Sequence, residues 1–279
     1  GLETWHIYVG DHCREDYGDI RFTNSTGAEL AYYLWPDYDS SSARFCVRLE
    51  GADAAGEVIV WYGNPTATTT SDGDSVYIDF VDGSTTSGWT STTGPLPTAI
   101  NGELRWTSPT QITYRTAQVN GHTTPVLVEY RAKHQNCRTL GLSKTSSVVP
   151  DFGNWIAPDS QVQRFAAEYN DDNYQSSTAP IENQYALYKI LWTASDVYIY
   201  ENGVQKLHKT SNIPNYLAGF TAYIKSSDSS PYLYLDWLTI RAYSATPPAA
   251  TAFSGERETA APLQPFPGCS NDPTDPDAD

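Results

Sequence analysis

The chain has 279 residues, and its 33 acidic residues against 17 basic ones give a formal net charge of −16. Binding to phosphate backbones rests on clustered Lys and Arg, so this charge argues against nucleic acid as a partner. The sequence also lacks the run of about 18 consecutive apolar residues that a membrane-spanning helix needs. We therefore expect a protein that neither binds nucleic acid nor inserts into a membrane.

Aromatic residues make up 13% of the chain, which is too many for a disordered protein and indicates a sizeable core. The abundance of Ser, Thr, Tyr and Val favours strands over helices. The sequence contains no methionine and begins at Gly1. We interpret Gly1 as a processed terminus and expect an exported protein, extracellular or at the cell surface, although a chain cut there for another reason would look the same.

Alternation of apolar and polar residues, which predicts strands, recurs at short intervals. The clearest runs are 5–9, 44–49, 57–61, 126–130, 197–200 and 232–240. Three Asn-Gly pairs fall between strand-like runs and supply the positive φ angles of tight hairpin turns: Asn101-Gly102, Asn120-Gly121 and Asn202-Gly203. No window of a dozen residues shows helical periodicity. The sequence predicts an all-β sandwich.

Changes in composition divide the chain. Residues 66–75 are rich in Thr, Ser and Gly, as linkers are, so we expect them to separate a β-sandwich module at 1–65 from a larger β module at 76–243. Proline and acidic residues accumulate over 244–279. We expect this segment to be an extended, Pro-rich acidic tail.

Two motifs resemble an uncharacterised family of secreted archaeal and bacterial proteins, catalogued as a domain of unknown function. They are Asp19-Ile20-Arg21-Phe22 and Trp61-Tyr62-Gly63-Asn64-Pro65. Later runs, at 188–192, 197–203 and 235–241, resemble strands of a concanavalin A-like jelly roll. Over roughly residues 5–243 the resemblance implies a small β-sandwich followed by a jelly roll in an extracellular setting, without an assigned activity.

The N-terminal module of that family opens with a further strand, ahead of the part that matches Trp5 to Val9. This chain begins too late to supply it. A missing strand leaves unpaired backbone groups and an apolar groove, which a strand from a neighbouring copy could fill. Strand complementation between copies is therefore a hypothesis.

A glycosidase needs two carboxylates facing one sugar, and on a strand these stand at alternate positions, as in the Glu-x-Asp-x-(x)-Glu signature of jelly-roll glucanases. The sequence contains no such spacing. Glu129 stands alone, and Glu168 with Asp171 and Asp172 has the wrong spacing. We expect no catalytic residues and no enzyme activity.

The four cysteines are even in number and widely spaced, which in an exported protein favours disulfides. Four cysteines allow three connectivities. The pairing that we favour joins Cys13 to Cys46 within the first module and Cys137 to Cys269, which would hold the tail on the second.

Calcium is the metal that the jelly-roll resemblance implies, in a structural role. In similar jelly rolls an Asp of the last long strand binds Ca²⁺ together with backbone carbonyls of early strands, and calcium prefers such oxygen ligands. The matching positions here are Asp236, Asp79, Asp82, Asn101 and Gly102. The alternative is that Asp236 pairs with a neighbouring Arg or a turn amide.

Aromatic residues in loop-like contexts could stack on sugar rings. The candidate glycan-binding residues are Trp35, Tyr38, Trp155, Tyr169 and Tyr174. Ordinary packing is the alternative for each one. Asn24 begins an Asn-Ser-Thr sequon and is a candidate glycosylation site.

Three classes of function remain, and glycans or further copies of the chain are the expected partners. The first is a non-catalytic glycan-binding or adhesion protein of the cell surface, because the jelly roll is expected and catalytic carboxylates are not. The second is a structural subunit of an extracellular filament or surface layer, assembled by strand complementation or docking of the tail. A glycoside hydrolase comes third.

Overall fold

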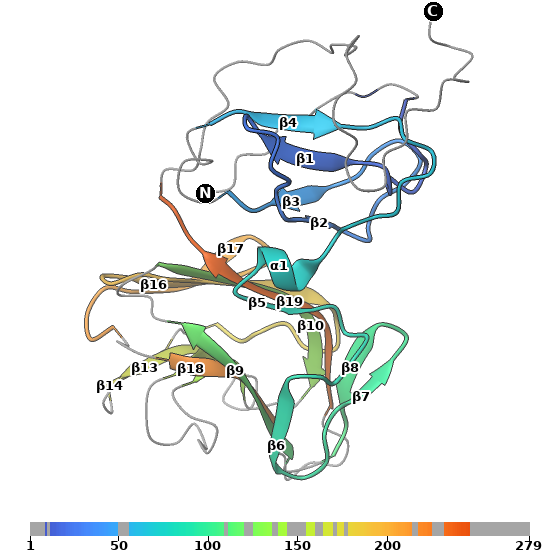
Figure 1. The fold of residues 1–279 in the computed structure, drawn as a ribbon. Coiled ribbons are helices and arrows are strands. Elements are labelled where there is room, and N and C mark those ends of the chain that lie inside the picture. Colours follow the sequence, from blue (N-terminus) through green and yellow to red (C-terminus); the bar gives the residue numbers. More distant parts are fainter. Residues whose placement is uncertain are drawn as a thin grey trace, which may run out of the picture. The chain divides into compact units, whose positions relative to one another are not determined.

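The structure of the protein is a computed structural model, shown in Figure 1. It describes residues 9, 12–49, 56–108, 111–119, 125–135, 139–143, 155–159, 164–169, 172–175, 178–213, 217–224 and 232–245. The chain forms two compact units, of which unit 1 comprises Gly1–Val76 with Ala245–Asp279 and unit 2 comprises Tyr77–Ser244. Within the described residues, no helix is both long and apolar enough to span a membrane.

Unit 1 is built from short antiparallel strands around an aromatic core. Strand β1 (Arg21–Asn24) pairs with β4 (Val58–Trp61), and β2 (Tyr32–Leu34) pairs with β3 (Phe45–Val47). The rings of Phe22, Tyr32 and Phe45 contact one another with centroids 5.4 to 5.9 Å apart. Such ring contacts give a small module much of its buried apolar area.

Residues 66–75, which we expected to be a linker, are hydrogen-bonded into unit 1. The Leu34 amide donates to Ser71 Oγ at 2.8 Å, and the Asp72 amide donates to the Tyr32 carbonyl at 3.0 Å. The one-turn helix α1 (Gly73–Val76) ends the unit. The segment is therefore part of the first unit rather than a free connection.

Unit 2 contains two antiparallel sheets. The strands of the eight-stranded sheet follow the order β17-β16-β15-β10-β19-β8-β7, with β5 also pairing β19, and those of the seven-stranded sheet follow β14-β13-β12-β11-β18-β9-β6. Their bounds are β5 Asp79–Val81, β6 Trp89–Thr93, β7 Thr98–Ile100, β8 Glu103–Trp106, β9 Gln111–Val119, β10 Val126–Gln135, β11 Thr139–Ser143, β12 Trp155–Asp159, β13 Arg164–Tyr169, β14 Asp172–Gln175, β15 Ala186–Trp192, β16 Val197–Glu201, β17 Val204–Lys209, β18 Leu217–Ile224 and β19 Tyr232–Ala242.

The chain passes repeatedly from one sheet to the other, as β8, β9, β10 and β11 do in succession. Such crossing connections between two packed antiparallel sheets define a jelly roll. The structure confirms the all-β prediction of a β module followed by a jelly-roll sandwich. The strands expected within 44–49, 57–61, 126–130, 197–200 and 232–240 are all present.

Side chains that alternate inward along the strands fill the space between the two sheets. Tyr130 of β10 is fully buried, contacts the Phe220 ring of β18 at 5.3 Å and donates its hydroxyl to the Leu140 carbonyl at 2.7 Å. Trp106 is also fully buried and donates its indole N–H to Thr113 Oγ1 at 2.7 Å. Both large side chains thus bury their rings while their polar groups keep partners.

Two of the expected Asn-Gly hairpins are confirmed. Asn101 and Gly102 have φ angles of 53° and 75° between β7 and β8, and Asn202 and Gly203 have φ angles of 49° and 78° between β16 and β17. Paired positive φ angles are what a tight hairpin turn demands. The pair Asn120-Gly121 lies outside the described residues.

Candidate functional site

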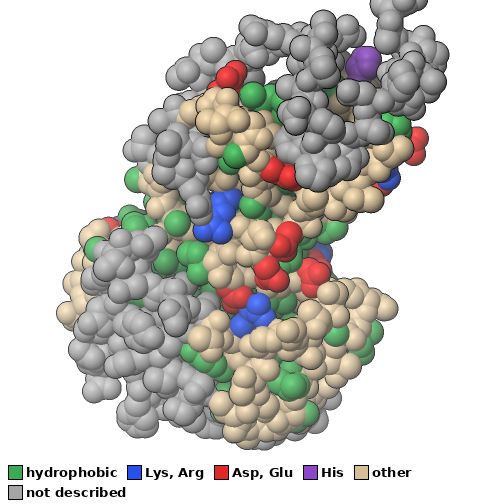
Figure 2. Space-filling view, viewed as in Figure 1, with side chains coloured by type: hydrophobic (Ala, Val, Ile, Leu, Met, Phe, Trp, Pro, Cys, Tyr) green, Lys and Arg blue, Asp and Glu red, His purple; other side chains and the backbone are tan. Residues whose placement is uncertain are grey.

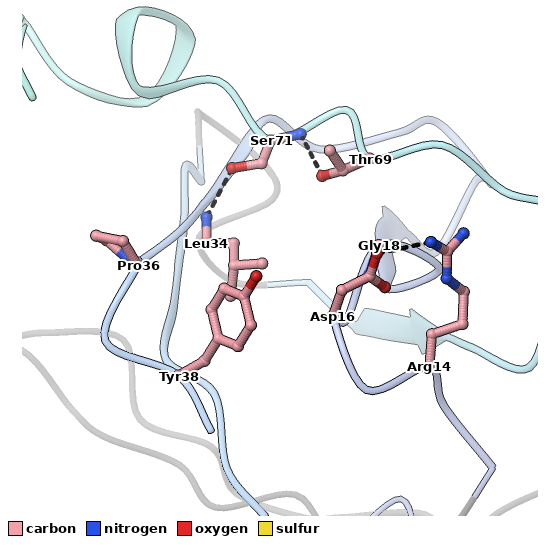
Figure 3. Close-up of a pocket in the computed structure, with 8 residues that line it drawn as sticks. All are labelled: Arg14, Asp16, Gly18, Leu34, Pro36, Tyr38, Thr69 and Ser71. Atoms are coloured by element: carbon pink, nitrogen blue, oxygen red, sulfur yellow. Dashed lines mark hydrogen bonds and ion pairs between the residues drawn. The ribbon is translucent and has the colours of Figure 1, made fainter. Parts of the chain in front are cut away.

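A pocket of about 320 Å³ opens on unit 1 (Figure 3). It combines an aromatic ring, an ion pair, hydroxyl groups and apolar side chains. Its lining residues are Arg14, Asp16, Gly18, Leu34, Pro36, Tyr38, Thr69 and Ser71.

The acidic part of the pocket is Asp16, which is held from two sides. Its Oδ1 accepts the Gly18 amide at 3.0 Å, and its Oδ2 pairs with Arg14 Nη2 at 2.6 Å. The backbone hydrogen bond from Gly18, helped by Arg14, lowers the pKa of the Asp16 carboxyl below its usual value. Arg14 is itself fixed, because its Nη1 donates to the Ala67 carbonyl at 2.6 Å. The pocket therefore presents a stable carboxylate.

The aromatic part is Tyr38, whose side chain is 39% exposed. The Tyr17 ring meets it edge to face, with centroids 5.7 Å apart. In Figure 3 the Tyr38 ring lies beside Leu34, while the Asp16 carboxylate turns toward Arg14. A ring held on one side by another ring and open to solvent can stack on a flat ligand. Tyr38 is the predicted glycan-binding residue that lines this pocket.

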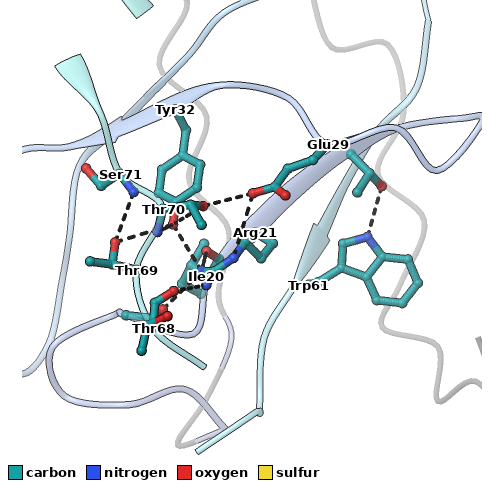
Figure 4. Close-up of polar contacts among 11 residues, drawn as sticks. Ile20, Arg21, Glu29, Tyr32, Trp61, Thr68, Thr69, Thr70 and Ser71 are labelled. Atoms are coloured by element: carbon teal, nitrogen blue, oxygen red, sulfur yellow. Dashed lines mark hydrogen bonds and ion pairs between the residues drawn. The ribbon is translucent and has the colours of Figure 1, made fainter. Parts of the chain in front are cut away.

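Arg21, in the first of the two sequence motifs, makes polar contacts with the segment that carries two of the lining residues (Figure 4). Arg21 is 8% exposed and donates from Nη1 to the Gly18 and Ile20 carbonyls at 3.0 and 2.6 Å and to the Tyr32 hydroxyl at 3.0 Å. Its Nη2 donates to the Thr68 carbonyl. Because Thr68 precedes the lining residues Thr69 and Ser71, Arg21 holds their segment in place.

The neighbouring Asp19 joins the two motifs to each other. Its Oδ1 accepts the Arg14 amide at 3.1 Å, and its Oδ2 accepts the Gly63 amide at 2.8 Å. Trp61 donates its indole N–H to Thr23 Oγ1 at 2.9 Å. Asp19 and Trp61 therefore join separate segments of unit 1 by hydrogen bonds, and none of the motif residues lines the pocket.

The remaining predicted aromatic residues do not form a surface with Tyr38 in the part of the chain that the structure describes. Trp35 is 8% exposed, because the Arg44 guanidinium covers its ring at 4.4 Å, and its indole N–H donates to Cys46 Sγ at 3.4 Å. The expectation that Trp35 is a sugar platform is wrong. The side chains of Trp155, Tyr169 and Tyr174, on β12, β13 and β14, lie outside the described residues.

The predicted calcium segments meet in unit 2. A Cβ at Gly83 would lie 2.1 Å from the Gly102 carbonyl oxygen and 2.6 Å from that of Asp236, so all three backbones converge there. Carbonyl oxygens are suitable calcium ligands. Asp82 lies beside this point, but its Oδ1 accepts the Ser84 amide at 2.9 Å.

Two of the predicted carboxylate ligands pair with arginines. Asp236 pairs with Arg131, and Asp79 accepts the Arg115 Nε at 2.7 Å. Among the described residues no three Asp, Glu, His or Cys side chains gather around one point. Structural calcium stays a prediction, and a fall in melting temperature on chelation would support it.

The predicted modification sites stay predictions. Cys13 packs against the unit 1 core and Cys46 lies on β3, and both are partly buried, but no bond joins their sulfur atoms in the structure. Cys137 and Cys269 lie outside the described residues. Asn24 is the last residue of β1 and precedes an exposed turn, where its Oδ1 accepts the Thr26 hydroxyl at 2.7 Å.

The fold and the site define the class of protein: it is an all-β protein with a jelly roll and a small module that carries a pocket. Residues 16–93 match the family described as "Domain of unknown function (DUF2341)". This match begins at Asp16 of the pocket and ends in β6 of unit 2. No curated protein sequence matches the chain.

Several solved structures resemble the chain. The Bacillus licheniformis beta-glucanase is 13% identical, with a TM-score of 0.42 over 58% of this chain and 97% of that one. A beta-1,3-1,4-glucanase (lichenase) from a mouse hindgut metagenome is 10% identical, with a TM-score of 0.44 over 58% and 98%. The Emp47p carbohydrate recognition domain is 8% identical, with a TM-score of 0.43 over 56% and 89%.

Proposed function

We propose that the protein is an extracellular, non-catalytic glycan-binding or adhesion protein, and that the unit 1 pocket holds one sugar residue against Tyr38. The observation that carries the proposal is the combination of a half-exposed tyrosine ring with an ionised carboxylate and two hydroxyl side chains in one pocket. Its volume of about 320 Å³ is at the lower end of the range for small-molecule sites. This size suits a single sugar ring.

Each group in the pocket has a role in sugar binding. The apolar face of a pyranose stacks on the Tyr38 ring. Sugar hydroxyls donate to the Asp16 carboxylate, and charge-assisted hydrogen bonds of this kind are the stronger ones. Ser71 Oγ already accepts the Leu34 amide at 2.8 Å, so its own proton is available to a sugar oxygen.

The electrostatics of the pocket support binding rather than hydrolysis. A glycosidase needs one carboxylic acid whose pKa is raised so that it can protonate the leaving group. Hydrogen bonds lower the pKa of Asp16, which is the single carboxylate among the residues that line the pocket. A carboxylate of this kind accepts hydrogen bonds but is a poor general acid.

The proposal is tested by screening the purified protein on a glycan array beside the Asp16→Asn variant. Asn keeps an oxygen for the Gly18 amide but lacks the charge, so we expect the same glycans to bind about tenfold more weakly. Release of reducing ends from a bound glycan would favour the hydrolase. Ordered polymers in negative-stain images, without glycan binding, would favour the structural subunit.

A further inference from the structure

The outer face of the eight-stranded sheet carries a row of tyrosines and cations. Along β10 the core residues Val128, Tyr130 and Ala132 alternate with Glu129, Arg131 and Lys133, which therefore point away from the other sheet. We name the tyrosine–cation row by its six members, which lie on or next to the adjacent strands β15, β10, β19 and β8: Tyr185, Arg131, Lys133, Tyr232, Tyr234 and Arg105.

Cations and rings alternate across these strands. The Arg131 guanidinium carbon lies 4.2 Å from the centre of the Tyr185 ring, and that of Arg105 lies 4.8 Å from the Tyr234 ring. Lys133 Nζ is 5.5 and 5.8 Å from the rings of Tyr232 and Tyr234. Cation–π contacts of this kind hold each positive group over a ring. Three positive charges are thus fixed at defined places on one flat face.

Two carboxylates lie beside the row and leave it an excess of positive charge. Arg131 pairs with Asp236, and Arg105 Nη2 pairs with Glu103 at 2.8 Å. Within the described residues, no carboxylate lies at ion-pair distance from Lys133. The row therefore has three cations against two acids, in a chain whose net charge is −16. Its charge is opposite to that of the protein as a whole.

The size and chemistry of the row point to an acidic polysaccharide. Adjacent strands are about 4.8 Å apart, so four strands span roughly 14 Å, which is more than one sugar ring needs. Cations held over tyrosine rings attract carboxylate or sulfate groups. A polysaccharide that carries such groups matches both the length of the row and its charge.

We infer that the tyrosine–cation row binds a polysaccharide with carboxylate or sulfate groups, with Lys133 facing an acidic group and the Tyr234 ring holding Lys133 and Arg105 in place. This site differs from the unit 1 pocket in its unit, its residues and its ligand. Its acidic ligand is recognised through charge, so raised salt weakens binding.

Binding of polygalacturonate, measured by isothermal titration, tests the inference, with fully methyl-esterified polygalacturonate as the matched neutral ligand. We expect the acidic polymer to bind at least about tenfold more tightly than the ester, and Lys133→Gln to weaken binding about threefold. Arg44→Gln removes the same charge from an exposed side chain of unit 1 and is the control, with unchanged binding expected.

Equal binding of the acidic and esterified polymers would overturn the inference, and so would unchanged binding by Lys133→Gln. Tyr234→Leu tests the ring that holds these cations and should weaken binding without changing its salt dependence. If that variant does not fold, Lys133→Gln still decides the question, because it removes only the charged end of a partly exposed side chain. Tyr38→Ala leaves this binding unchanged, so failure here is distinct from failure of the unit 1 pocket.

Discussion

Arg21 is the buried side chain that contacts the segment carrying two of the lining residues of the unit 1 pocket. It is 8% exposed and satisfies backbone carbonyls from two separate segments of the chain. Methionine has a similar volume but no donor, so Arg21→Met leaves those carbonyls without partners. We expect a loss of about 3 kcal/mol in the free energy of unfolding, measured by chemical denaturation.

Arg44→Met is the matched surface control for that experiment. The Arg44 side chain is 57% exposed and pairs with Asp37, an exposed contact that contributes little. We expect a loss of about 1 kcal/mol or less. Equal losses for the two variants would show that Arg21 is not the anchor described above.

His134 gives unit 2 a pH dependence. Its side chain is 3% exposed, its Nε2 lies 2.8 Å from the Tyr188 hydroxyl, and burial lowers its pKa to about 4. Between about pH 6.5 and 4 the unfolded chain therefore binds more protons than the folded one, so stability falls as the pH falls through this window. Over the whole window the free energy of unfolding falls by up to about 3 kcal/mol.

Thermal unfolding of the wild type and His134→Gln across this pH range tests the prediction. Glutamine keeps a polar group for Tyr188 but does not titrate, so the melting temperature of the variant should fall less between pH 7 and pH 4. An identical fall in both proteins would assign the pH dependence to other groups.

Single residues were predictable from the sequence where their environment is local. Asn101 and Asn202 adopt the expected positive φ angles because an Asn-Gly turn depends on its own residues. The role of Arg21 was not predictable, because its partners Tyr32 and Thr68 follow it by 11 and 47 residues. Trp35 looked like a loop aromatic, and only the folded chain places Arg44 over its ring.

At the scale of elements, the backbone of Gly83, which follows β5, lies against the β7–β8 hairpin and β19. Its φ angle is +74°, and a Cβ there would lie 2.1 Å from the Gly102 carbonyl oxygen. Gly203 has a similar φ of +78° in the β16–β17 hairpin, but nothing lies within 4 Å of a Cβ built there. The two glycines share a positive φ, which would strain a residue with a side chain, and differ in the crowding around that side chain.

Alanine at these two positions separates strain from crowding. Gly203→Ala should lower the free energy of unfolding by about 1 kcal/mol, because a residue with a side chain is strained at a positive φ. Gly83→Ala should cost more than about 3 kcal/mol, because the backbone oxygens around it must also move. The check is the free energy of unfolding of each variant, and comparable values would contradict the described convergence.

Strands were the elements that the sequence predicted best, because alternation of apolar and polar residues reports which face is buried. The role of residues 66–75 was missed for the opposite reason. A Thr-rich stretch has the composition of a linker, but its hydroxyl and carbonyl groups bind partners such as Tyr32 and Arg21 that lie elsewhere in unit 1. The composition of a segment gives its residue types but not the residues elsewhere in the chain that it contacts.

At the scale of the whole molecule, the chain carries a net charge of −16. Figure 2 shows acidic side chains in small groups, with basic ones close to some of them. The tyrosine–cation row is one place where the local charge reverses. Overall charge thus argues against nucleic acid, and the two proposed glycan sites rest on local charge and aromatic rings.

The central claim is that Tyr38 stacks on a sugar in the unit 1 pocket, and isothermal titration of one glycan selected on the array tests it most directly. Tyr38→Phe keeps the ring, so its affinity should stay within about threefold of the wild type, whereas Tyr38→Ala should bind at least about tenfold more weakly. Matching melting temperatures would show that both variants are folded. Wild-type affinity in Tyr38→Ala would contradict the claim.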